Sequence, residues 1–234
     1  MTESVFVTGG SRGIGLATAR RFRAAGARVA VCSRAGGDIP DLLSIPCDVT
    51  SPLAVENAFA TVEHRHGPVT VLVANAGVTR DGLLGELAEE DFTAVAEVNL
   101  TGVFTVVRRA VPAMIERGHG RIILISSVVG LMGAPGQTNY CATKSALIGM
   151  GRSLARELAD AGITVNIVSP GLIETEMTAE LSPRRRRDIL AAIPLGRAGT
   201  ADEVARAVQF LASADAAYIT GAVLPVSGGL GLGH

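Results

Sequence analysis

The sequence predicts an α/β fold, a single doubly wound parallel sheet of about seven strands with helices on both faces. Short β-branched runs alternate with longer Ala-rich amphipathic stretches, which is the pattern of repeated strand–helix units. The short runs are apolar throughout, as expected of strands in a parallel sheet that is covered on both faces. No linker or low-complexity segment divides the chain, so we expect one domain over residues 1–234.

The expected elements are placed by this alternation. Glycines and prolines between residues 34 and 48 leave little room for a crossover helix. The long segment of about 172–199 has space for a short helix, and we expect it to form the mobile wall of a ligand site. Strands are expected at Ser4–Thr8, Arg28–Ser33, Val69–Asn75, Arg121–Ser126, Thr164–Ser169 and Ala222–Val226, with a weaker one at Leu43–Cys47. Helices are expected near Ile14–Ala25, Pro52–His66, Glu89–Arg117, Asn139–Ala161 and Ala201–Ser213.

Composition argues against several classes of function. The net charge of −1 argues against nucleic acid as the main partner. No hydrophobic N-terminal segment follows a basic start, and no apolar run approaches membrane-spanning length, so we expect a soluble cytoplasmic protein that binds no membrane. Cys32, Cys47 and Cys141 lack CxxC spacing and the histidines are scattered, so neither a disulfide framework nor a metal site is indicated.

Lys144 is the only lysine, because arginine supplies the other 20 of the 21 basic residues. Tyr140, one of only two tyrosines, lies four residues earlier on an expected helix, so both side chains share a face. A close ammonium favours the phenolate, and shifting the pKa of a tyrosine from about 10 to about 7 requires roughly 4 kcal/mol. Taken alone, the two residues also fit an ordinary surface pair.

A glycine-rich turn follows the first strand and opens the first helix. Gly9, Gly13 and Gly15 permit a tight turn and close backbone approach, and the helix N-terminus offers N–H groups to a phosphate. This context predicts a Rossmann-like dinucleotide site, although the spacing Gly-x-x-x-Gly-x-Gly differs from the usual Gly-x-Gly-x-x-Gly.

The end of the second strand bears on the choice of dinucleotide. Arg34 follows this strand, where an acidic residue would favour NAD. Together with Arg12 it suits a 2′-phosphate, so we expect NADP(H). In so arginine-rich a chain, both residues also fit ordinary surface positions.

Five motifs occur in the order found in a known enzyme family: Gly9-x-x-x-Gly13-x-Gly15, Asn75-Ala-Gly77, Ser127, Tyr140-x-x-x-Lys144 and Pro170-Gly171. On these residues the chain resembles the classical short-chain dehydrogenases/reductases over essentially its full length. Within that family, Asp48-Val49, Ser127–Gly130, Ile173–Met177 and Pro225–Gly229 are most similar to 3-oxoacyl-[acyl-carrier-protein] reductases. The short 34–48 connection and the Gly-Leu-Gly-His ending resemble the mycobacterial-type reductase of long-chain acyl elongation.

The resemblance implies the catalytic residues Asn99, Ser127, Tyr140 and Lys144. Tyr140 would protonate the carbonyl oxygen as hydride arrives at the carbon, and Lys144 would lower the tyrosine pKa and hold the nicotinamide ribose. Ser127 would hydrogen-bond the carbonyl, whereas strand alternation sends Ser126 to the opposite face. Asn99 would stabilise a helix irregularity and hold a water; alone, it would rather suggest a cap or a turn.

The resemblance also implies the cofactor contacts, which come from the glycine-rich turn and from the residues after successive strands. They are Gly9, Ser11, Arg12, Gly13, Ile14, Gly15, Arg34, Asp48, Val49, Asn75, Ala76, Gly77, Tyr140, Lys144, Pro170, Gly171, Ile173 and Thr175.

A substrate wall is expected at residues 132–137 and 174–193. A run of arginines, Arg184–Arg187, would attract an acidic carrier protein or coenzyme A phosphates, or is a solvated charge run. Candidate contacts are Ser127, Met132, Gln137 and Met177. The apolar residues Leu131, Met132, Met177, Leu181 and Ile193 suit an acyl chain, although such a lining also fits other ketone reductases.

Three functions stay open at this point. The first is NADPH-dependent reduction of a 3-oxoacyl thioester, linked to acyl carrier protein or coenzyme A, in fatty acid biosynthesis. The second is oxidoreduction of another ketone or alcohol, such as a small ketone, steroid, sugar or quinone, and the third is non-catalytic dinucleotide sensing. The four intact catalytic residues argue against the sensor. The resemblance further implies a homotetramer that pairs through Glu89–Arg117 and Asn139–Ala161.

Overall fold

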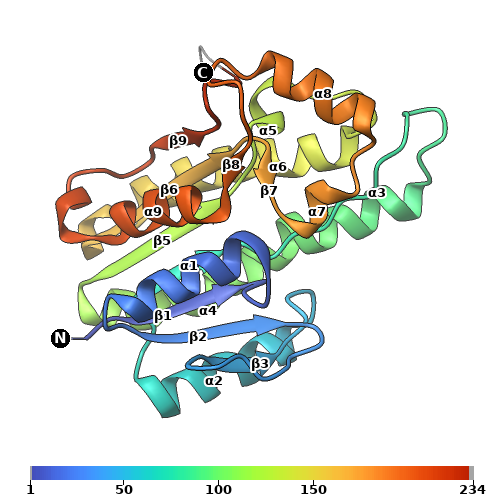
Figure 1. Ribbon diagram of the computed structural model, residues 1–234. Helices are drawn as coiled ribbons and strands as arrows, with labels where there is room; N and C mark the ends of the chain where they lie inside the picture. The colour runs from blue at the N-terminus through green and yellow to red at the C-terminus, as the bar shows by residue number, and fades with distance from the viewer. Residues whose placement is uncertain (1, 232–234) are drawn as a thin grey trace.

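Seven parallel strands form one sheet in the order β3-β2-β1-β4-β5-β6-β9. The computed structural model describes residues 2–231, with helices on both faces of this sheet (Figure 1). The strand order reverses between β1 and β4, which places a ligand-binding switch point at their carboxyl ends. The expected fold class is confirmed. The strands are β1 Ser4–Thr8, β2 Arg28–Ser33, β3 Leu43–Pro46, β4 Val71–Ala74, β5 Gly120–Ile125, β6 Ile163–Pro170 and β9 Val223–Val226.

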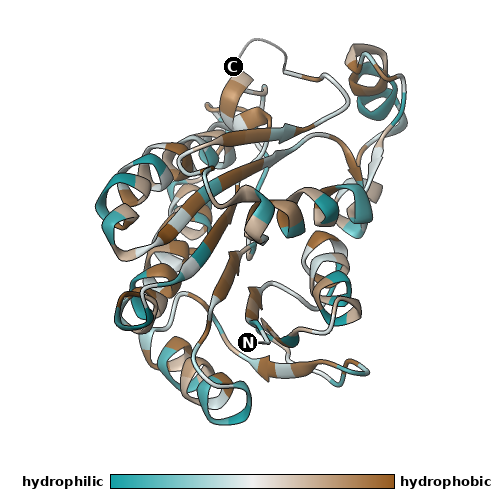
Figure 2. Ribbon diagram, turned by 90° about the vertical axis from the view of Figure 1, so that its left-hand side faces the viewer, coloured by the Kyte–Doolittle hydropathy of each residue, from teal (hydrophilic) through white to brown (hydrophobic). Residues whose placement is uncertain are grey.

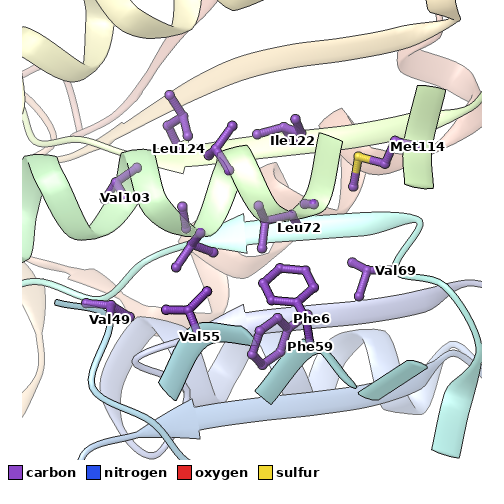
Figure 3. Close-up of a cluster of buried hydrophobic side chains, with 14 of the residues drawn as sticks. Phe6, Val49, Val55, Phe59, Val69, Leu72, Val103, Met114, Ile122 and Leu124 are labelled. Atoms are coloured by element: carbon purple, nitrogen blue, oxygen red, sulfur yellow. The ribbon is translucent and has the colours of Figure 1, made fainter. Parts of the chain in front are cut away.

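Strand alternation divides the core into two layers. In β1, Phe6 packs toward one face of the sheet, and Val5 and Val7 pack toward the other. The helices α2 Pro52–His66, α4 Val103–Arg117 and α6 Thr138–Glu157 cover the Phe6 face, while α1 Gly13–Ala24 and α9 Ala201–Ala212 cover the opposite face. The ring centres of Phe6 and of Phe59, in α2, are 5.1 Å apart and the rings meet edge to face. Figure 3 shows these two side chains beside each other. Figure 2 shows that the strands are largely hydrophobic and that the helices carry hydrophilic residues as well.

The expected helix Glu89–Arg117 is interrupted by a π-helical turn. It consists of α3 Glu89–Ala96, the π-helix η1 Glu97–Gly102 and α4. This composite helix is long and apolar enough to cross a membrane by length and composition, so the expectation that no run approaches that length is wrong. Its inner side packs into the layer around Phe6, because Val103, Val106 and Met114 are buried there.

The segment 172–199 is more structured than expected. It contains α7 Glu176–Ala179 and α8 Pro183–Ala192 in place of one short helix. Its two ends pair as β7 Ile173–Glu174 and β8 Gly199–Thr200, a second small parallel sheet. Three further short helices are α5 Val129–Met132, η2 Ala159–Ala161 and η3 Ala214–Ala216. As expected, no helix lies between β2 and β3. The end of the chain, 232–234, to which the finer resemblance extends, lies outside the described residues.

Candidate active site

Two connected cavities open at the carboxyl ends of the strands. The smaller, of about 380 Å³, lies over the glycine-rich turn, and the larger, of about 770 Å³, lies between β5, α6 and the segment 172–199. They share the lining residues Ile14, Asn75, Gly77, Thr175 and Met177, so a ligand in one meets a ligand in the other.

Glycine backbone forms the floor of the smaller cavity. A Cβ at Gly15 would lie 2.4 Å from the Gly9 carbonyl oxygen, and Gly9 itself has a φ of +64°. The absence of side chains thus lets the N-terminus of α1 approach the sheet closely. The first turn of α1 contains no acidic residue of its own, and the positive end of the helix dipole lies at the cavity. This cradle fits the pyrophosphate of a dinucleotide.

Asn75 holds the turn in place. Its side-chain nitrogen donates to the carbonyl oxygens of Thr8 at 2.9 Å and Gly9 at 3.1 Å. In return, the Thr8 hydroxyl accepts from the backbone nitrogens of Asn75 and Ala76, each at 3.1 Å. The ends of β1 and β4 are therefore joined by four hydrogen bonds, which fixes the floor of the cavity before any ligand binds.

Arg34 and Asp48 form part of the wall of the smaller cavity. Hydrogen bonds from the backbone and hydroxyl of Thr50 lower the pKa of Asp48, with a smaller contribution from Arg34. Cys32 and Cys47 form part of this wall, and their thiols are hydrogen-bonded to each other. That bond and burial raise the pKa of Cys32, whereas the pKa of Cys47 is lowered by the same bond.

Ser127 and Tyr140 meet in the wall of the larger cavity. Ser127 follows β5, Tyr140 lies in the first turn of α6, and their side chains are hydrogen-bonded. The neighbouring Ser126 instead donates from its hydroxyl to the Lys144 carbonyl oxygen at 2.8 Å, which fastens β5 to α6. The structure thus separates the two adjacent serines into one that contacts Tyr140 and one that contacts the helix backbone.

Lys144 is 3% exposed, and its ammonium donates to the Ile125 carbonyl oxygen at 2.8 Å. Burial lowers the pKa of Lys144 to about 8. Burial also raises the pKa of Tyr140 to about 12, partly opposed by the bond from Ser127. The groups that shift the tyrosine pKa in this structure do not include Lys144, so the expectation that Lys144 lowers it stays a prediction.

Asn99 lies in the π-helical turn and is fully buried. Its side chain pairs with both backbone groups of Val78, accepting from the nitrogen at 2.9 Å and donating to the oxygen at 3.0 Å. It also donates to the Thr143 hydroxyl at 3.3 Å. The irregular turn therefore joins the segment after β4 to α6, close to Lys144.

The predicted cofactor residues all lie at the two cavities. Each of them lines one of the two cavities: thirteen line the smaller one, and Tyr140, Lys144, Pro170, Gly171 and Ile173 line the larger. The candidate substrate residues Ser127, Met132, Gln137 and Met177 line the larger cavity as well.

Two residues expected to suit an acyl chain lie elsewhere. Leu131 and Ile193 do not line the cavity, whereas Leu181 does. A Cβ at Gly228 would lie 2.8 Å from Ile193, which is buried against the segment after β9. Ile193 is therefore part of the packing beneath the segment, and its place in the substrate wall was wrongly predicted.

Sequence reasoning missed Asn139 and Asp81. Asn139 is fully buried, donates to the Arg80 carbonyl oxygen at 2.8 Å and accepts from the Tyr140 nitrogen at 2.7 Å, so it orients the start of α6. Asp81 lines the larger cavity and accepts from Gln137. The position of Asn139 directly before the Tyr140 motif was the only signal for it in the sequence.

Comparison with known proteins agrees with this site. A protein-family model described as "Enoyl-(Acyl carrier protein) reductase" matches residues 9–231. The 3-oxoacyl-[acyl-carrier-protein] reductase MabA of Mycobacterium avium is 52% identical over 234 residues, covering 100% of this chain and 92% of the relative. MabA of Mycobacterium tuberculosis strain H37Rv is 50% identical, with 100% and 95% covered. FabG of Escherichia coli K12, also named as a 3-oxoacyl-[acyl-carrier-protein] reductase, is 48% identical over 232 residues, with 96% and 95% covered.

These similarities extend over the whole sheet and both cavities. The relatives are reductases, and this kind of reductase implies a nicotinamide dinucleotide as the cofactor. The glycine floor, the open N-terminus of α1 and the Ser127–Tyr140 contact agree with that cofactor in their chemistry. The chain belongs to the short-chain dehydrogenase/reductase family.

Proposed function

We propose that this protein catalyses the NADPH-dependent reduction of a 3-oxoacyl thioester to the 3-hydroxyacyl thioester, in fatty acid biosynthesis. One observation carries the proposal: hydrogen-bonded Ser127 and Tyr140 line a large cavity that shares part of its wall with a dinucleotide cleft. Identity of about half to 3-oxoacyl-[acyl-carrier-protein] reductases over the full chain supports the substrate class.

NADPH, when bound, supplies the hydride for the carbonyl carbon. Tyr140 donates its proton to the carbonyl oxygen, and Ser127 holds that oxygen through a hydrogen bond. With a pKa of about 12, Tyr140 is protonated at neutral pH, as a proton donor must be. Because an alkoxide is a stronger base than a phenolate, the proton transfer is downhill. Lys144 supplies a buried cation beside Gly77 and would hold a ribose hydroxyl of the cofactor there.

The preference for NADPH over NADH rests on Arg12 and Arg34. Both side chains are exposed and line the smaller cavity, one at the start of α1 and one after β2. Two guanidinium groups suit the 2′-phosphate that distinguishes NADPH. Asp48 lines the same cavity and has its carboxylate bonded to Thr50, and neither arginine makes an ion pair with it.

The test is an NADPH-oxidation assay with acetoacetyl thioesters of acyl carrier protein and coenzyme A. Unrelated ketones, including a quinone and a steroid, serve as comparisons under the same conditions. Preferential turnover of the thioesters, with the 3-hydroxyacyl product identified by mass spectrometry, supports the proposal. Faster turnover of an unrelated ketone would assign the protein to another reaction of its family.

An acidic carrier protein would meet the arginines of α8. Arg185 pairs with Asp81 and Arg186 with Glu174, which leaves Arg184 and Arg187 exposed for a partner. Replacing these two by alanine should raise the KM for the carrier-bound substrate more than the KM for a small diketone. Equal increases in KM for both substrates would show that a carrier protein does not dock at Arg184 and Arg187.

Assembly into a homotetramer is a further part of the proposal. Phe92, Phe104 and Ile115 are each more than 40% exposed on the composite helix Glu89–Arg117, which is unusual for large apolar side chains. A second copy would cover them. Light scattering should give a tetramer for the wild type and smaller species for Phe104→Glu; a monomeric wild type would contradict this assembly.

A further inference from the structure

One carboxylate joins three separate walls of the larger cavity. Asp81, in the segment after β4, accepts from the Gln137 side-chain nitrogen at 3.0 and 2.9 Å. It also accepts from a guanidinium nitrogen of Arg185, on α8, at 3.2 Å. All three side chains line the cavity, and Gln137 directly precedes the helix that carries Tyr140.

This carboxylate is the polar attachment of α8 to the rest of the molecule. Among residues 2–231, the Arg185–Asp81 bond is the one side-chain hydrogen bond that links α7 or α8 to a residue outside the segment 172–199. Arg186 pairs with Glu174, which belongs to the same segment. Backbone contacts provide the other attachments: β7 pairs with β8, and just beyond α8 the Leu195 nitrogen donates to the Gly228 carbonyl oxygen at 3.0 Å. The segment is thus fixed by backbone hydrogen bonds near its ends, and the Arg185–Asp81 contact holds the first turn of α8.

The partner segment of Asp81 is held much more firmly. The backbone nitrogen of Gly82 donates to the Gly136 carbonyl oxygen at 2.9 Å, and Asn139 donates to the Arg80 carbonyl oxygen. Asp81 therefore stands on a rigid support, and the exposed Arg185 is the movable side of the contact. Its side chain is 38% exposed and that of Asp81 is 34% exposed, so the pair can break and re-form in water.

We propose that Asp81, Gln137 and Arg185 form a clasp that holds α8 over the cavity and so determines which acyl chain lengths the enzyme prefers. This inference rests on the proposed reduction of 3-oxoacyl thioesters. Met177, Leu181 and Ile189 of the held segment line the cavity, so a longer acyl chain buries more surface against them. Each fully buried methylene contributes a factor of about four in affinity.

The chain-length dependence separates a clasp from a general structural role. With α8 held, kcat/KM should rise along a series of 3-oxoacyl thioesters of increasing length. In Asp81→Asn, which keeps the shape of the side chain but removes its charge, that rise should flatten. We expect the loss to be about threefold to tenfold for long chains and smaller for the four-carbon substrate. An equal loss at every length overturns the proposal.

The arginines of α8 provide a second readout that needs no substrate. Trypsin cleaves after arginine, and Arg184–Arg187 lie on the held helix. Asp81→Asn should be cut within α8 about threefold to tenfold faster than the wild type, with the sites identified by mass spectrometry. The control is Asp91→Asn, which breaks the neighbouring Arg80–Asp91 pair outside the cavity and should be cut at the wild-type rate. Equal cutting of both variants overturns the clasp.

A charge exchange completes the test. The double variant Asp81→Arg with Arg185→Asp should regain the wild-type chain-length dependence, because Gln137 can accept as well as donate. A double variant with the flattened dependence of Asp81→Asn contradicts the pairing. If the wild type reduces no 3-oxoacyl thioester, the proposed function fails, while the trypsin comparison still decides whether α8 is clasped.

Discussion

Lys144 and Tyr140 share one face of α6 without a hydrogen bond between them. The ammonium lies 5.6 Å from the centre of the tyrosine ring and donates to the Ile125 carbonyl oxygen. Tyr140 is instead hydrogen-bonded to Ser127. Lysine and tyrosine are thus positioned by separate partners, both at the end of β5, and each can be altered without removing the other's support.

Tyr140→Phe separates proton transfer from cofactor binding. Loss of the hydroxyl should lower turnover by about 10²- to 10⁴-fold, the usual contribution of a general acid. The affinity for NADPH should stay nearly unchanged, since the ring still fills its place. Turnover and a fluorescence titration with NADPH measure the two effects, and near-normal turnover would overturn the proposed mechanism.

The buried ammonium of Lys144 should make the free energy of unfolding depend on pH. Its pKa is about 8 in the folded protein and about 10.4 in an unfolded chain, so the unfolded state binds more protons between these values. The free energy of unfolding of the wild type should therefore rise relative to Lys144→Met over this pH range, by up to about 3 kcal/mol. Below pH 8 the difference in the free energy of unfolding between the wild type and Lys144→Met should be constant.

Paired denaturant titrations of the two proteins measure this difference. The contribution of Tyr140, whose raised pKa acts with the opposite sign above pH 10, is present in both proteins and cancels. A difference that stays flat across the whole range would show that Lys144 is not desolvated in solution.

Arg34→Asp should reverse the preference between the two nicotinamide dinucleotides. The variant loses a charge-assisted contact with the 2′-phosphate, and its carboxylate can accept from the ribose hydroxyl of NADH. We expect the ratio of kcat/KM for NADPH over NADH to fall by about 10- to 100-fold. Arg20→Asp, an exposed position on α1 away from the cavity, is the matched control. An unchanged ratio in Arg34→Asp would exclude the 2′-phosphate contact.

Gly15→Ala tests the close approach at the floor of the cofactor cavity. The new Cβ would lie 2.4 Å from the Gly9 carbonyl oxygen and 2.6 Å from the Asn75 side-chain nitrogen, so the turn must shift. We expect a loss of about 1–3 kcal/mol in the free energy of unfolding and much weaker NADPH binding. Gly85→Ala, where the Cβ meets open space, should stay within about 0.5 kcal/mol of the wild type.

The sheet was predictable because its central strands are buried on both sides and so are largely apolar. All five residues of Ser4–Thr8 are buried, and the predicted and observed bounds of this strand coincide. The helix Glu89–Arg117 was predicted as one unit, but its π-helical turn was not located by periodicity, because one extra residue per turn barely changes an apolar pattern. Only the resemblance suggested an irregularity at Asn99.

Residues that meet through tertiary contacts were harder to predict. Cys32 lies on β2 and Cys47 directly follows the neighbouring β3, and nothing in their sequence spacing indicates hydrogen-bonded thiols. Asp81 and Arg185 are 104 positions apart and meet only because the segment 172–199 folds back over the cavity. The pKa of Tyr140 also depends on the depth of its burial, which spacing along one helix does not report.

The burial of Lys144 makes the protein unusual as a target for amine-reactive reagents. No other side chain in the chain is a primary amine, so acylating or crosslinking probes can react only there and at the chain's own amino terminus. An amine with a pKa of about 8 is partly unprotonated near neutrality and therefore nucleophilic once a reagent reaches it. The rate of labelling at this one position becomes a direct measure of how often the interior opens to solvent.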